Sequence, residues 1–169
     1  QGSHDCFCGR WPDPLAMGAR CSELADVDCD CSRTAEGRYL APPGDNVDPN
    51  ARDSRGLTPL MIATMHGHET CLQHLIQSGA ELDIRDRCGW TALIHAAFRG
   101  QDSCLRLLVA HGADLNARDF LGTTAAMRAA IGGHTQCLQV LVEHGAELQS
   151  KDKLGLAVIE HARRKGHVL

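Results

Sequence analysis

Short blocks of apolar and polar residues follow one another along the second half of the chain with helical spacing. The block that precedes Gly67 opens with Thr58 and Pro59, residue types favoured at a helix N-cap and at the first helical position. The block between Gly67 and Gly79 carries apolar residues on one helical face: Cys71, Leu72, Leu75 and Ile76. Glycine is a common helix terminator, so the pattern predicts two short helices that end before Gly67 and Gly79.

This two-helix pattern returns with a period of 33 residues. Thr91 and Thr124 stand where Thr58 does, and Gly100 and Gly133 stand where Gly67 does. Further columns of identical residues include Asp53, Asp86, Asp119 and Asp152, and Gly56, Gly89, Gly122 and Gly155. One unit of this size does not bury its apolar face alone, so we expect the units to stack and share a core.

The motifs within the units carry a family resemblance. Gly56-Leu-Thr-Pro-Leu60 and Gly89-Trp-Thr-Ala-Leu93 open the first two units, and His111-Gly-Ala-Asp-Leu-Asn116 ends the second. With these motifs and this period the chain resembles the ankyrin-repeat family from about Asp45 to Leu169. The resemblance implies an all-α repeat, namely an ankyrin solenoid of stacked helix pairs with β-hairpin loops. The family's usual His after Thr-Pro-Leu is replaced by Met61, Ile94 and Met127.

The sequence also predicts how the chain is divided. Residues 1–4, Gln-Gly-Ser-His without an initiator Met, are expected to be a tag remnant. Residues 5–44 form a small irregular Cys-rich segment, interpreted as an N-terminal cap. Residues 45–169 hold the repeats, in units near 53–85, 86–118 and 119–151 and a partial unit at 152–169.

Composition and charge narrow the function classes. The net charge of −4 provides no basic field, which argues against nucleic acid as a partner. No apolar run of about 18 residues is present, so membrane insertion is not expected. No Gly-rich phosphate loop, His-Glu-x-x-His or Gly-x-Ser-x-Gly occurs, and we therefore expect no enzyme. Ankyrin repeats are mostly intracellular binding modules, so the resemblance favours a binding protein of the cytoplasm or nucleus. We expect this protein to be a monomer.

The resemblance implies binding through the hairpin tips and the concave groove of the first helices. The matching positions are Arg55, Leu57, Met65, His66, Arg87, Cys88, Trp90, Phe98, Arg99, Phe120, Leu121, Ile131 and Leu154. The three aromatic residues of the repeats, Trp90, Phe98 and Phe120, all fall on these columns, so we expect them to be exposed rather than in the core. The alternative is local packing, with Trp90 folded over its neighbour hairpin.

Exposed apolar and aromatic residues with flanking arginines favour a protein or peptide partner that has apolar anchors. The sequence therefore predicts a protein–protein interaction module. A second hypothesis is a regulatory or targeting fragment of a larger protein, such as a chromatin enzyme, a ligase adaptor or a channel.

The cysteines fall into separate groups. Cys71, Cys104 and Cys137 repeat with the period and are predicted to be small buried side chains. Cys88, next to Arg87, is a hypothesis for a reactive hairpin thiol. Thiolate ligands in two close pairs suit a structural zinc ion, for which the candidates are Cys6, Cys8, Cys21, Cys29 and Cys31. The alternatives for these five are unstructured reduced thiols or disulfides.

Two further columns are interpreted as structural or modified positions. The Arg-Asp pairs that begin at Arg52, Arg85 and Arg118 are expected to hold neighbouring hairpins together. Asn116, within Leu-Asn-Ala-Arg-Asp, resembles the hairpin asparagine that an asparaginyl hydroxylase modifies in the ankyrin family. We therefore expect Asn116 to be a modification site.

Overall fold

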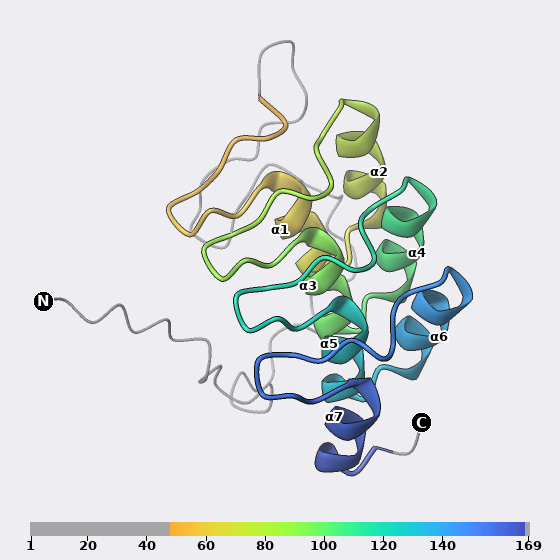
Figure 1. The fold of residues 1–169 in the computed structure, drawn as a ribbon. Coiled ribbons are helices and arrows are strands. Elements are labelled where there is room, and N and C mark those ends of the chain that lie inside the picture. The colour runs from red at the N-terminus through yellow and green to blue at the C-terminus, as the bar shows by residue number, and fades with distance from the viewer. Residues whose placement is uncertain (1–47, 168–169) are drawn as a thin grey trace, which may run out of the picture.

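The computed structural model describes residues 48–167, which form seven α-helices in paired layers. The first helices of successive units stack in one layer, and the second helices stack in a layer beside it (Figure 1). The loops that join the units all extend on the same side of the stack. The helices are α1 Pro59–His66, α2 Glu69–Gln77, α3 Ala92–Arg99, α4 Asp102–Ala110, α5 Ala125–Gly132, α6 Thr135–Glu143 and α7 Val158–Lys165.

The predicted helix caps are confirmed. The hydroxyl oxygens of Thr58, Thr91 and Thr124 each accept a hydrogen bond from the backbone N–H three residues later, at 3.3–3.4 Å. Such a bond satisfies one of the four N–H groups that a helix leaves without an internal partner. A glycine with a φ of 70–72° ends each of these helices: Gly67, Gly100 and Gly133. These φ values lie in the left-handed region, which glycine adopts without a Cβ clash.

The core lies between the two layers and between successive units. The first helices contribute small buried side chains, which include Ala63, Ala96, Ala129 and Ala162. The second helices contribute larger ones, among them Leu72, Leu105, Leu108, Leu138 and Leu141. Each buried leucine contributes about 2 kcal/mol through removal of apolar surface from water. The scarcity of aromatic residues is therefore compatible with a well-filled core, because the first helices pack closely through alanines.

The cysteine column is buried as predicted. Cys71, Cys104 and Cys137 have at most 2% of their surface exposed. Burial, together with the nearby charges of Glu69 and Asp102, raises the pKa of the Cys104 thiol to about 11. Burial likewise raises the pKa of Cys137 to about 11. Cys104 and Cys137 therefore behave as small core side chains rather than as nucleophiles.

The connections between units are tight hairpins. The N–H of Asp53 donates to the carbonyl of Leu57 at 3.0 Å, and the equivalent bond closes each later hairpin. Within residues 48–167 the hairpins consist of turns, without a β-strand. Successive hairpins are joined by backbone bonds, for example from the N–H of Lys153 to the carbonyl of Leu121 at 2.9 Å.

The predicted arginine column also joins the hairpins. The Arg85 guanidinium donates to the carbonyl of Arg118 at 2.9 Å, and Arg52 donates to the carbonyl of Arg85 in the same manner. Each of these arginines thus bonds to the backbone of the next unit. In the last described unit Ala157 replaces the capping threonine, and the Glu160 carboxylate accepts the Ala157 N–H at 2.9 Å instead. No helix between residues 48 and 167 is long and apolar enough to cross a membrane.

Candidate binding surface at the hairpin tips

Each hairpin tip is organised by the aspartate at its start. The Oδ1 atom of Asp86 accepts hydrogen bonds from the N–H groups of Cys88 and Trp90, both at 2.8 Å. Asp53, Asp119 and Asp152 accept the equivalent two bonds at 2.8–2.9 Å. Each carboxylate thereby satisfies two backbone donors and fixes the turn, in charge-assisted bonds that are stronger than neutral ones.

The second carboxylate oxygen of three of these aspartates contacts a side chain nine residues later, in the first helix of the same unit. The pairs are Asp86–His95 at 2.9 Å, Asp119–Arg128, and Asp152–His161 at 2.8 Å. In the first unit the position nine residues after Asp53 is Ile62, and the exposed Arg55 contacts Asp53 at 3.4 Å. This pairing does not follow from the motifs of the sequence, although the column Ile62, His95, Arg128 and His161 repeats with the same period.

These contacts favour the ionised carboxylates. Burial on its own would raise the pKa of Asp86, but hydrogen bonds from His95 and the hairpin N–H groups, with the charge of His95, lower the pKa below its usual value. The pKa of Asp152 is lowered in the same way, against the effect of burial, by its hairpin N–H groups and by His161. The negative charges of the hairpins are therefore held inside the fold.

Trp90 is buried, which corrects the expectation that the repeat aromatics all face solvent. Only 7% of its surface is exposed. Its ring meets Phe98 edge-on at 5.2 Å between centroids and lies 5.0 Å from His95. The guanidinium of Arg128, from the next unit, lies 4.5 Å from the ring centroid in a cation–π arrangement. Trp90 therefore joins two units, as the local-packing alternative proposed.

Leu57, in the same hairpin position as Trp90, is also buried, at 6% exposure. In both residues the N–H bonds to the aspartate four residues earlier, and the side chain belongs to the core cluster. Leu57 and Trp90 are unsuited to first contact with a partner.

The outer turn of each hairpin is exposed. Phe120 is 56% exposed, Leu121 52% and Leu154 77%, and these are the large apolar residues that the third and fourth tips present to solvent. Arg55 and Arg87 occupy exposed positions of the first and second tips. The exposure expected for these five residues is confirmed.

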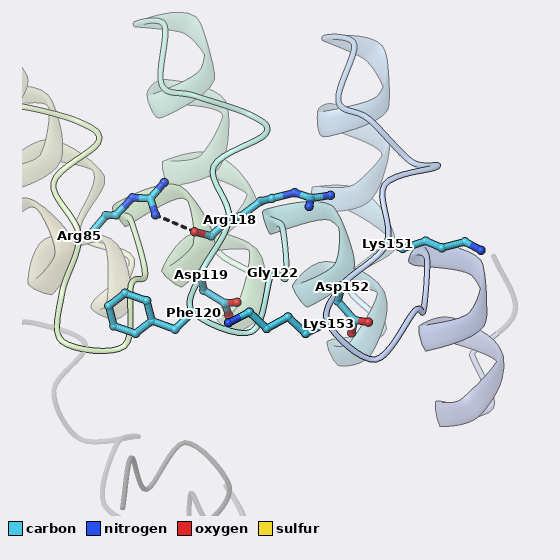
Figure 2. A pocket seen from close by; sticks show the side chains of 8 residues that line it. All are labelled: Arg85, Arg118, Asp119, Phe120, Gly122, Lys151, Asp152 and Lys153. Atoms are coloured by element: carbon cyan, nitrogen blue, oxygen red, sulfur yellow. Dashed lines mark hydrogen bonds between the residues drawn. The ribbon is translucent and has the colours of Figure 1, made fainter. Parts of the chain in front are cut away.

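A shallow depression of about 680 Å³ lies over the third and fourth hairpins. Figure 2 shows Arg85, Arg118 and Lys151 extending in the same direction along the stack, while Phe120 and Lys153 lie at the outer turns. The remaining lining residues are Asp119, Gly122 and Asp152. Their two carboxylates are already paired with Arg128 and His161, so the unengaged charges of the depression are positive.

The hairpin geometry agrees with the comparison of the sequence with known families. The family model for ankyrin repeats, three copies long, matches residues 37–119 and, in an overlapping alignment, residues 65–152. The chain belongs to the ankyrin-repeat family. No curated protein matches the sequence significantly. Ankyrin repeats are in general protein–protein interaction modules, and this broad function holds for the chain.

The ankyrin first helices supply the other predicted contact positions. Met65, Phe98 and Ile131 recur with the period and are each half-buried, while His66 and Arg99 are exposed. Partial removal of the His66 ring from water, with the charges of His68 and Arg99, lowers the pKa of His66. The first helices therefore present a row of partly accessible apolar side chains, beside the exposed side chains of His66 and Arg99.

Cys88 and Asn116 keep their predicted roles as hypotheses. Cys88 is half-buried and packs against the core cluster, and its N–H donates to Asp86. The Oδ1 atom of the exposed Asn116 accepts the N–H of Glu147 at 2.9 Å, so its amide links two ankyrin units. The predicted zinc ligands Cys6, Cys8, Cys21, Cys29 and Cys31 lie outside the described residues, and zinc stays a prediction.

The histidine column at the second helices has a structural role. The ring Nε2 of His134 lies 3.1 Å from the carbonyl oxygen of Phe98, in the preceding ankyrin unit. The same ring packs so closely over Gly100 that a Cβ there would lie 2.5 Å from His134 Nδ1. His134 therefore holds two units together. Within residues 48–167 no group of His, Cys, Asp and Glu side chains is arranged to hold a metal ion.

Proposed function

We propose that this ankyrin array binds a partner peptide or protein, with apolar anchors, through its hairpin tips and the row of first-helix residues. The observation that carries the proposal is the exposure of Phe120, Leu121 and Leu154 on neighbouring tips. Clustered exposed apolar side chains are unfavourable in water and usually mark an interaction surface. Met65, Phe98 and Ile131 extend this surface along the stack.

The test is selection of short random peptides, displayed on phage, with the full chain as bait. The comparison variant is Phe120→Ser/Leu121→Ser/Leu154→Ser, which removes the apolar tips. The matched control is Val142→Ser/Ile159→Ser, because these residues are also exposed but lie on α6 and α7, away from the tips. We expect the wild type and the control to enrich the same apolar-anchored peptides and the tip variant to lose them.

Peptides that bind all three proteins equally would contradict the use of the hairpin tips. Thermal unfolding of each variant, followed by circular dichroism, separates loss of the surface from loss of the fold. The second hypothesis from the sequence, a regulatory or targeting part of a larger protein, concerns what the array is attached to and stays a prediction.

A further inference from the structure

The charges at the hairpin edge are segregated by the fold. The four hairpin aspartates turn inward, where each accepts two backbone N–H bonds. The cationic residues of the same hairpins are exposed: Arg52, Arg55, Arg85, Arg87, Arg118, Lys151 and Lys153. A chain of net charge −4 thus presents a cationic edge.

The exposed acidic residues nearest the cationic edge lie in neighbouring loops of the described repeats. Glu81, Asp83, Asp114 and Glu147 are exposed in the loops that leave the second helices, before the hairpins. The Asp83 carboxylate and the N–H of Asp114 join two of these loops at 3.0 Å. The cationic edge is therefore bordered by acidic loops.

The cationic edge has a recess at the third and fourth hairpins. Within residues 48–167 the side chains of Arg118, Lys151 and Lys153, which line the recess, make no hydrogen bond or ion pair. Phe120 lies at the same recess, and its ring is held against the turn of the preceding hairpin, where a Cβ on Gly89 would lie 3.1 Å from it. Figure 2 shows Lys153 reaching from the fourth hairpin toward Phe120.

We infer that this recess binds an acidic segment of the partner protein, with an apolar side chain of that segment packed on Phe120. The inference rests on the proposed function and adds the chemistry of the ligand. Carboxylates of the segment would face Arg118, Lys151 and Lys153, whose charges have no anionic partner among residues 48–167. A nucleic acid fits less well, because the cationic edge is short, the neighbouring loops are acidic, and the recess has an apolar wall.

The test compares two charge-reversed forms of the full chain that have the same net charge. Lys151→Glu/Lys153→Glu reverses the recess, and Arg106→Glu/Lys165→Glu reverses two exposed residues outside it. Both are used as baits in the peptide selection, beside the wild type. Peptides enriched by the wild type are then synthesised with a fluorescent label, and their affinities are measured by fluorescence anisotropy at low and high salt.

We expect the wild type and the Arg106/Lys165 control to enrich peptides in which Asp and Glu flank an apolar residue. A selected peptide should bind the recess variant at least about tenfold more weakly, and high salt should weaken its binding to the wild type. Phe120→Ser should also weaken the same peptide by about tenfold, because it removes the apolar contact.

Other results would overturn the inference. Enrichment of apolar peptides without acidic residues, still dependent on the tips, would leave the proposed function intact and remove the acidic ligand. A short DNA duplex that binds the wild type as tightly as the selected peptide would identify a general polyanion surface. Selection of no peptide that depends on the tips would count against both proposals.

Discussion

Trp90 and Phe120 are aromatic residues on adjacent hairpins, yet the first is buried and the second is exposed. Trp90 is the fourth residue after Asp86, where the N–H bonds inward and the side chain enters the space between units. Phe120 directly follows Asp119 and stands on the outer turn. Leu57 and Thr123 share the position of Trp90 and are buried. Leu156, at the same position of the last hairpin, is half-buried. The position within the hairpin therefore favours burial for residues of different types.

This difference separates residues that stabilise the array from residues that are available to a partner. A hairpin residue four positions after the aspartate contributes to the contact between units. The first and second positions after the aspartate are exposed in the four hairpins, with the exception of the half-buried Cys88, and the exposed residues there can change without disturbing the core. The expected effects of substitution on stability should follow this division, from the inner position to the outer one.

The largest expected effect is that of Trp90→Ala. The substitution removes a buried ring that contacts Phe98, His95 and Arg128, and it should lower the free energy of unfolding by about 3–5 kcal/mol. Urea denaturation followed by circular dichroism measures the loss. Phe120→Ala, the matched aromatic substitution on the next hairpin, should cost under about 1 kcal/mol. Equal losses for the two variants would refute the comparison.

The next effect concerns the carboxylate beneath the third tip. Asp119→Asn keeps an oxygen for the two hairpin N–H bonds but removes the charge that faces the nearly buried Arg128. It should lower the free energy of unfolding by about 3 kcal/mol, because the guanidinium is left without its counter-charge. Asp53→Asn is the control, since the first unit has Ile62 at the corresponding position. It should cost under about 1 kcal/mol, and the reverse order would contradict the assigned pairing.

Most of the fold follows from the sequence because each unit repeats its own local rules. Thr58 and its equivalents predict the helix starts, and the glycine columns predict the helix ends, and both are confirmed. The units are also expected to stack from the pattern alone, since a single unit lacks a core of its own. A column that is ambiguous in one unit can be assigned from the equivalent residues of the other units. A repeat is therefore easier to recognise than a single domain.

The candidate site was less predictable. The exposure of Phe120, Leu121 and Leu154 follows from their columns, whereas the expected exposure of Trp90 was wrong. The family contact columns are not uniformly accessible, because the Trp90 side chain belongs to the core cluster and contacts the next unit. The pairing of Asp119 with Arg128 joins residues nine positions apart, a spacing outside the usual helical and hairpin patterns. The two residues come together only because the hairpin tip packs against the first helix of the same unit.

A third expected effect is a loss of stability in acid. The pKa values of Asp86 and Asp152 are lowered in the folded chain, so their stabilisation is fully present above the unfolded-state pKa. It is lost as the pH falls from that value through the lower folded-state pKa, because the unfolded chain binds protons more readily. The free energy of unfolding, measured by urea denaturation across this range, should decline with falling pH. The variant Asp86→Asn/Asp152→Asn should show a shallower decline, and an unchanged slope would contradict the role of these carboxylates.

The smallest expected effect on stability belongs to the outermost residues, Leu121 and Leu154. Their side chains are already half or more in water, so replacement by serine removes little apolar surface from the folded core. Leu121→Ser and Leu154→Ser should each change the free energy of unfolding by no more than about 0.5 kcal/mol. Leu57→Ser, at the inner position of the first hairpin, is the matched control and should destabilise the array strongly. A stable array that has lost peptide binding after the two outer substitutions would separate the two roles of a hairpin. A large loss of stability in either outer variant would instead show that the tips pack against the described repeats more than their exposure indicates.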